Sequence, residues 1–282
     1  MKYSPVIVMG MHRSGTSALV RALRDMGLFI GHDLEPNSEA RYFLNLNEAL
    51  LAMAGSRWDS PHSMLRVLED EDLVAWMSSW LDAKMSGFET SLYLSKPNWF
   101  RYRDIRNFPQ AWGWKDPRNV LTLPIWLKLF PDAKVIHVVR HPVDVASSLK
   151  VRELKLRDIT LEEKANPEQW KVTSPQCFDL EYGVKLWETY VSVAEKALAA
   201  VPKQQQMTVV YEDWLSQPRV YLDKLHTWLN LDATYEVIQG ITEGLHVDRR
   251  FAFKQDEKLS QFTKEKTQAS YWIKHYYGNE GA

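Results

Sequence analysis

The sequence predicts an α/β fold, a parallel sheet flanked by helices, because short apolar runs alternate with segments of helical periodicity. Residues 6–9 form an apolar, largely β-branched run that stops at Gly10, as expected of a buried strand. From Ser17 the period changes, and apolar residues recur at helical spacing until Gly27, a favourable helix end. A strand, a glycine-bounded loop and a helix in this order form the first half of a βαβ unit.

The same alternation continues along the chain. Three further apolar runs are predicted to be strands, at residues 111–115, 134–139 and 207–211. Helical spacing is found at residues 121–129, 144–150 and 180–200. Strands that alternate with helices build a mostly parallel sheet with both faces covered.

We expect a single domain over residues 1–282 with two distinctive segments. Residues 55–110 are interpreted as a helical, Trp-rich lid or acceptor-binding region, although ordinary core packing is the alternative for any one tryptophan. The apolar stripe of its one clear helix is predicted to comprise Leu73, Trp76, Met77, Trp80 and Leu81. Residues 155–175 mix charges with Asn-Pro and Ser-Pro pairs, which predicts a mobile loop.

Composition excludes several classes of protein. Among 282 residues, 45% are hydrophobic and 12% aromatic, which excludes disordered and coiled-coil proteins. The net charge of −1 argues against nucleic-acid binding, and the single cysteine, Cys177, is typical of a reducing compartment. No apolar run approaches the roughly 18 residues of a membrane span, so we expect a cytoplasmic protein. No cysteine pair exists for zinc, and we expect no metal site.

Residues 10–17 join the first strand to the first helix and read Gly-Met-His-Arg-Ser-Gly-Thr-Ser. Gly10 and Gly15 have P-loop spacing, but Thr16 stands where the P-loop lysine would be. Small residues let several N–H groups converge on one anion, and the helix N-terminus adds its dipole. Arg13 supplies a cation, so the segment predicts a P-loop NTPase-like sheet with a bound phosphate. The alternative is a simple glycine-rich turn.

The strand at residues 134–139 ends in Arg140 rather than in an acidic residue. A P-loop NTPase needs the missing lysine for the nucleotide phosphates and a strand-end acid for Mg²⁺. A second basic group at a strand end instead indicates a second phosphate site. The sequence therefore predicts a ligand with two separated phosphates that is used without Mg²⁺.

These motifs resemble the sulfotransferases that use 3′-phosphoadenosine 5′-phosphosulfate (PAPS) and release 3′-phosphoadenosine 5′-phosphate (PAP). The first-loop arginine is similar to that of the tyrosylprotein sulfotransferases, and Arg140 with Ser148 has the spacing of the family's second motif. The resemblance implies that the 5′-phosphosulfate end is bound by Arg13, Ser14, Gly15, Thr16 and Ser17. It implies that the 3′-phosphate is bound by Arg140, Ser148 and Arg152, of which Arg152 fits a solvated helix face equally well.

Two further segments fit the resemblance, which spans roughly residues 5–230. Lys115, in a Trp-Lys-Asp-Pro segment, is implied to stabilise the transferring sulfuryl group together with Arg13. Tyr211, in a Tyr-Glu-Asp segment, is implied to lie against the nucleotide. Ala18 replaces the adenine-stacking tryptophan of cytosolic members, which leaves Trp58 and Tyr211 as candidates for that contact.

The catalytic base and the C-terminal contact are less closely matched. The resemblance implies a carboxylate in the segment after the first helix, and Glu35 is the predicted base. The alternatives are His32, Asp33 and Glu39. The family's C-terminal basic loop has no clear match, and Arg249-Arg250 is either a surface pair or a ligand.

The predicted function is metal-free, in-line transfer of a sulfuryl group from PAPS to a hydroxyl of a sugar, a small molecule or a tyrosine. The hydroxyl-bearing acceptor is the one partner expected, with no nucleic acid. A kinase that uses ATP·Mg²⁺ is the first alternative, and the missing lysine argues against it. A PAP-binding module without catalytic activity is the second.

Overall fold

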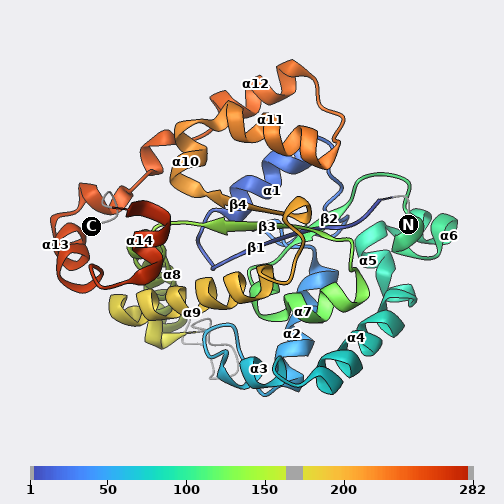
Figure 1. Ribbon diagram of the computed structural model, residues 1–282, viewed down its shortest axis with the longest axis horizontal. Coiled ribbons are helices and arrows are strands. Elements are labelled where there is room, and N and C mark those ends of the chain that lie inside the picture. Colours follow the sequence, from blue (N-terminus) through green and yellow to red (C-terminus); the bar gives the residue numbers. More distant parts are fainter. Residues whose placement is uncertain (1–2, 163–173, 279–282) are drawn as a thin grey trace.

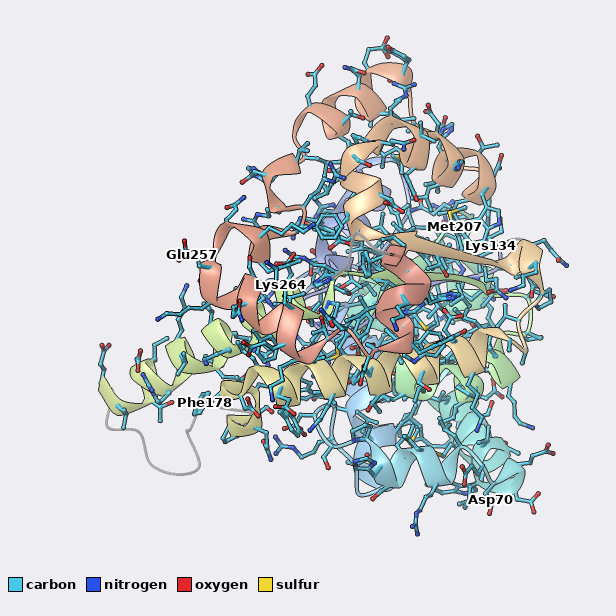
Figure 2. The ribbon with its side chains drawn as sticks, turned by 60° about the vertical axis from the view of Figure 1, so that its left-hand side comes forward. Asp70, Lys134, Phe178, Met207, Glu257 and Lys264 are labelled. Atoms are coloured by element: carbon cyan, nitrogen blue, oxygen red, sulfur yellow. The ribbon has the colours of Figure 1, made fainter. Side chains whose placement is uncertain are left out.

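A four-stranded parallel sheet lies at the centre of the computed structural model, which describes residues 3–162 and 174–278 (Figure 1). Its strand order is β2-β1-β3-β4, and every neighbouring pair is parallel. The strands are β1 (Val6–Gly10), β2 (Gly113–Lys115), β3 (Lys134–Val139) and β4 (Gln206–Val210). Figure 2 shows Lys134 and Met207 close together, where β3 and β4 begin at the same edge of the sheet. The predicted α/β class is confirmed.

Alternate residues of each strand supply two separate hydrophobic cores, one on each face of the sheet. Ile7 and Met9 of β1 belong to the larger core, whereas Val6 and Val8 belong to the smaller one. This alternation follows from the two-residue period of an extended strand. Because both faces are buried, the strand sequences are apolar throughout.

Helices cover both faces, as Figure 1 shows. The larger core is closed by α7 (Asn119–Leu129) and α9 (Leu180–Leu198), with α2, α3 and α4 outside them. The smaller core is closed by α1 (Thr16–Asp25), α10 (Tyr211–Ser216), α11 (Pro218–Leu229) and α12 (Tyr235–Glu243). The other helices are α2 (Arg41–Met53), α3 (His62–Val67), α4 (Glu71–Met85), α5 (Ser91–Leu94), α6 (Lys96–Tyr102), α8 (Pro142–Glu162), α13 (Glu257–Lys266) and α14 (Tyr271–Tyr277).

Helix α4 confirms the predicted helix and part of its predicted stripe, since Met77 and Leu81 are buried and Trp80 packs against the core. Leu73 and Trp76 are 43% and 57% exposed, whereas the buried face comprises Val74, Met77, Ser78, Leu81 and Met85. The side chain of Asp70 caps the helix by accepting from the backbone N–H groups of Asp72 and Leu73. The true stripe is therefore displaced toward the neighbouring positions, and α3, α5 and α6 join α4 within residues 55–110.

The predicted mobile loop is wrong where it can be compared. Residues 155–162 continue α8 as a regular helix, and residues 163–173 of the predicted loop lie outside the described residues. The charged residues that indicated a loop are those of a largely solvent-facing helix, and hydrophobic periodicity is weak there. No helix of the described residues is long and apolar enough to span a membrane.

Candidate functional site

A cleft of about 260 Å³ lies where the four strands end, as expected for an open parallel sheet. Nine residues predicted for the site line it, namely Arg13, Gly15, Thr16, Ser17, Lys115, Arg140, Ser148, Arg152 and Tyr211. The side chain of Ser14 is buried at the same loop. Among the predicted site residues, Glu35 is the one placed elsewhere. The cleft also includes Glu39, Arg21 and Arg249.

The first loop needs its glycines because of its backbone and its neighbours. Gly15 has a φ of 96° and precedes α1, and a Cβ built on it would lie 2.4 Å from the ring of Tyr211. Gly10 has a φ of 151°, and a Cβ there would lie 2.3 Å from the carbonyl oxygen of Val138. Both positions combine a left-handed backbone with close contact, which glycine alone accommodates. The loop is thereby pressed against both β3 and α10.

The first loop is joined directly to α8, the helix that follows Arg140. Arg13, itself in the left-handed region at a φ of 72°, donates from Nε to the hydroxyl of Ser148 at 2.8 Å. The buried hydroxyl of Ser14 has no hydrogen-bond partner within the described part of the chain. A buried polar group without a partner is costly, so this hydroxyl is available to a ligand. The groups that the sequence placed at two phosphate sites therefore meet in one cleft.

Four arginines are concentrated around this junction. Burial lowers the pKa of the Arg13 guanidinium, and the nearby charges of Arg152, Arg140 and Arg249 lower it further. Like charges so close together favour an anion between them. Arg140 is held over the ring of Tyr211, with its guanidinium carbon 4.8 Å from the ring centroid. Positive charge is therefore concentrated on the side of the cleft that these four arginines line.

The C-terminal segment is bound to the second loop through Asp144. The carboxylate of Asp144 accepts from the backbone N–H groups of Ala252 and Phe253, at 3.1 and 2.8 Å. It also lies 3.4 Å from Arg140, which donates to the carbonyl oxygen of Arg249 at 3.2 Å. The sequence left Arg249 open between a surface pair and a ligand, and the structure places it in the cleft.

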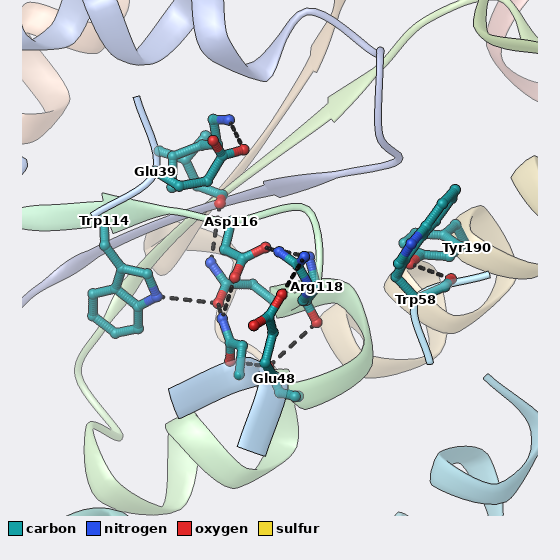
Figure 3. A network of polar contacts seen from close by, with 12 residues as sticks. Glu39, Glu48, Trp58, Trp114, Asp116, Arg118 and Tyr190 are labelled. Atoms are coloured by element: carbon teal, nitrogen blue, oxygen red, sulfur yellow. Dashed lines mark hydrogen bonds and ion pairs between the residues drawn. The ribbon is translucent and has the colours of Figure 1, made fainter. Parts of the chain in front are cut away.

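Lys115 and Glu39 form a buried ion pair at the other side of the cleft (Figure 3). Lys115 Nζ donates to Glu39 Oε1 at 2.5 Å. Burial lowers the pKa of Lys115, and the charge of Glu39 opposes this effect. The following residue, Asp116, accepts from Asn47 at 3.0 Å and from Arg118 at 3.1 Å, which fixes the end of β2. The amine and the carboxylate are thus held together where β2 ends in the cleft.

Comparison with known proteins agrees with this geometry. The model of the sulfotransferase family matches residues 5–235. The chain belongs to the sulfotransferase family. No protein of curated function matches its sequence. Residue 235 precedes Arg249, so part of this sulfotransferase's cleft comes from beyond the matched residues.

Solved sulfotransferase structures resemble the chain at low identity. The sulfotransferase domain from the curacin biosynthetic pathway is 18% identical, with 95% of this chain and 93% of that one covered and a TM-score of 0.48. The sulfotransferase domain of the Synechococcus PCC 7002 olefin synthase is 19% identical, with 95% and 90% covered and a TM-score of 0.48. The sulfotransferase from Alicyclobacillus acidocaldarius is 16% identical, with 93% of each chain covered and a TM-score of 0.46.

The predicted base, Glu35, does not line the cleft of this sulfotransferase. Its carboxylate is bound by Arg41, which also holds Asp33 at 3.0 Å. His32 and Asp33 border a different hollow, beside α5 and α6. Glu39 is the one of the four candidates that faces Lys115. Of the predicted base and its three alternatives, Glu39 is therefore the one that lines the cleft.

The two aromatic candidates for the adenine contact differ in their surroundings. Tyr211 lines both the cleft and an adjoining groove of about 670 Å³, which shares Ala18, Arg21 and Arg249 with it. Trp58 is mostly buried, with the guanidinium of Arg152 4.9 Å from its ring centroid and the ring of His12 at 4.6 Å. Tyr211 is 5% exposed and Trp58 is 9% exposed, so the two rings do not differ in accessibility. What distinguishes Tyr211 is that it lines the cleft and the adjoining groove.

Proposed function

We propose that this sulfotransferase moves the sulfuryl group of PAPS to an acceptor hydroxyl in one in-line step. The observation that carries the proposal is the cleft in which Arg13 of the first loop contacts Ser148 of α8, close to Arg140. Family membership supports sulfuryl transfer. The two basic loops, both at strand ends, support a donor with two separated phosphates.

The residues present fit this donor. The buried, unpartnered hydroxyl of Ser14 and the mutually close arginines both gain from an anion. We assign the 5′-phosphosulfate end to Arg13, Ser14, Gly15, Thr16 and Ser17. The 3′-phosphate is assigned to Arg140, Ser148, Arg152 and Arg249. The adenine is assigned to the adjoining groove, which Tyr211 lines.

The transfer needs positioning and charge stabilisation more than covalent chemistry. When bound, PAPS supplies the sulfuryl group, and PAP is the product that leaves. Arg13 and Lys115 stabilise the negative charge that develops on the oxygens between the sulfuryl group and the 5′-phosphate. Glu39 accepts the proton of the acceptor hydroxyl, whose oxygen forms the new bond to sulfur as the old S–O bond breaks. The acceptor is a hydroxyl of a sugar, a small molecule or a tyrosine.

Calorimetric titration with PAP, ADP and ATP·Mg²⁺ tests the donor. We expect PAP to bind most tightly, since ADP lacks the 3′-phosphate that Arg140 holds. Arg140→Ala should weaken PAP binding by about tenfold to a hundredfold, the usual range for a lost charged hydrogen bond. Labelled PAPS then allows a screen of sugars, phenols and tyrosine peptides as acceptors.

The other outcomes decide against the proposal. Binding of ATP·Mg²⁺ without PAP binding would make the chain a kinase. Tight PAP binding with no transfer to any acceptor would make it a PAP-binding module. Arg13→Ala is a further test of the proposed transfer, which should be lost with this guanidinium. Sulfation that persists in Arg13→Ala would contradict the mechanism.

A further inference from the structure

An aromatic patch lies at one end of the molecule, on η1 (Phe88–Thr90), α5 and α6. Phe88, Leu92 and Phe100 are 51%, 40% and 59% exposed, and we call these three residues the aromatic patch. Trp99 connects its two phenylalanines, with ring centroids 4.8 Å from Phe88 and 5.3 Å from Phe100. Contiguous exposed apolar surface of this kind marks an interaction site more often than single exposed residues do.

Three cations lie on the same segment as the aromatic patch. Lys96 lines a hollow with Leu92, the guanidinium carbon of Arg103 is 5.3 Å from the ring centroid of Phe100, and Arg101 follows Phe100 in the chain. Lys96, Arg101 and Arg103 are exposed, and among the described residues none of them has a carboxylate partner. The nearby acids are already paired: Glu89 with Lys84 at 3.5 Å, and both Asp82 and Asp104 with Arg106. The rim of the aromatic patch is therefore positively charged.

The backbone holds α6 in this exposed position under strain. Ser95 and Arg103 flank α6, and both are non-glycine residues in the left-handed region, at φ values of 73° and 62°. Such residues persist where the surrounding structure enforces them, and they are concentrated at functional segments. The buried hydroxyl of Tyr93 in α5 donates to the carbonyl oxygen of Gly113 at 2.6 Å, which anchors the segment to β2. The segment that carries the aromatic patch is thus fixed to the sheet by a buried hydrogen bond.

We propose that the aromatic patch docks this protein onto the surface of an anionic lipid bilayer. Aromatic and leucine side chains with flanking Lys and Arg are the composition that binds the membrane interface without spanning it. Each cation near an anionic surface strengthens binding by about fivefold. Figure 1 shows α6 at the edge of the molecule.

The charged rim argues against a second copy of the chain as the occupant. In a symmetric dimer the same patch meets itself, so Lys96, Arg101 and Arg103 would face their own copies. Like charges opposite one another oppose such an interface. An anionic bilayer instead complements all three cations at once. This docking is independent of the proposed transfer reaction.

Sedimentation of the full chain with vesicles tests the proposal. We expect binding to vesicles of phosphatidylcholine mixed with phosphatidylglycerol and little binding to phosphatidylcholine alone. Replacement of both phenylalanines, F88S with F100S, should lower the partition coefficient by about tenfold or more. K96Q with R101Q removes two cations at about fivefold each, so it should lower the partition coefficient by about 25-fold. The salt dependence of binding should also become weaker.

Tyr271→Ser is the matched control, because Tyr271 is 67% exposed on α14, far from the aromatic patch in the chain. It should leave vesicle binding unchanged, and thermal unfolding should show that all variants fold. Absence of wild-type binding to anionic vesicles would overturn the proposal. So would an equal loss in Tyr271→Ser, or a dimer in analytical ultracentrifugation that F88S with F100S abolishes.

Discussion

Lys115 and Glu39 are bound to each other at 2.5 Å although 76 positions separate them in the chain. One belongs to the end of β2, and the other to the irregular segment before α2. A buried charge without a partner is strongly destabilising, and in this pair the amine and the carboxylate compensate each other. The two groups proposed to stabilise charge and to accept a proton are thereby set side by side before any ligand arrives.

Glu39→Gln should lower kcat by about 10² to 10⁴, the usual contribution of a general base. PAP affinity should change little, because Glu39 pairs with Lys115 rather than with any of the four arginines. Initial rates with labelled PAPS and calorimetry with PAP measure the two quantities separately.

Glu35→Gln is the control for this prediction. It removes a carboxylate from the same segment, but one that Arg41 binds outside the cleft. We expect its turnover to stay close to that of the unaltered protein. A large loss in Glu35→Gln with a small one in Glu39→Gln would reverse the assignment of the base.

Gly15→Ala should weaken PAP binding and destabilise the fold, because its Cβ would overlap the ring of Tyr211. Gly55→Ala is a matched control, since Gly55 also has a positive φ, 61°, but nothing lies within 4 Å of its added Cβ. The control should cost about 1–2 kcal/mol from backbone strain alone. Urea unfolding and PAP titration compare the two variants, and equal losses would show that the contact with Tyr211 is unimportant.

The sequence predicted the sheet and both basic loops because local signals specify them. Apolar runs locate β1 and β3, and the residues that follow such strands must meet at one edge of a parallel sheet. Arg13 and Arg140 each follow such a strand, which is why both lie at the edge where the cleft is found. The hydrogen bond from Arg13 to Ser148 of α8 adds detail to that placement.

The base could not be chosen in this way. Residues 31–40 have no periodicity, and a turn in which Glu35 and Glu39 share a backbone hydrogen bond directs their side chains differently. Glu35 forms an ion pair with Arg41, and Glu39 forms one with Lys115. Which carboxylate lines the cleft therefore depends on tertiary contacts that the local sequence does not specify. Arg249 is a similar case. It lies near the cleft because Asp144 binds the backbone of Ala252 and Phe253, more than 100 positions further along the chain.

Asp144→Asn should loosen the C-terminal segment and weaken PAP binding by about tenfold, since an amide accepts at one oxygen where two N–H groups now donate. Trypsin cleavage after Arg249 and Arg250 should become faster. Asp256→Asn is the control, because Asp256 caps α13 in the same part of the chain without contacting Arg140. Equal acceleration in both variants would contradict a specific role for Asp144.

Glu212 makes stability depend on pH. Its buried carboxyl accepts from the backbone N–H of His141 and from the hydroxyl of Tyr277, each at 3.0 Å. Burial raises its pKa from 4.5 to about 7. The folded protein therefore holds this proton more tightly than the unfolded chain does. Stability should fall as pH rises from about 4.5 to about 7, by up to about 3 kcal/mol, and change little from this group above that window.

Glu212→Gln removes this titration while keeping an oxygen that can accept from His141. The variant should be nearly as stable as the unaltered protein near pH 5 and more stable than it near pH 7. Urea unfolding across this pH range measures the difference, with Glu236→Gln as an exposed carboxyl whose removal should leave the pH slope unchanged. A slope in Glu212→Gln equal to that of the unaltered protein would show that another group titrates there. A slope that disappears would identify Glu212 as the proton-binding link between the Arg140 loop and α14.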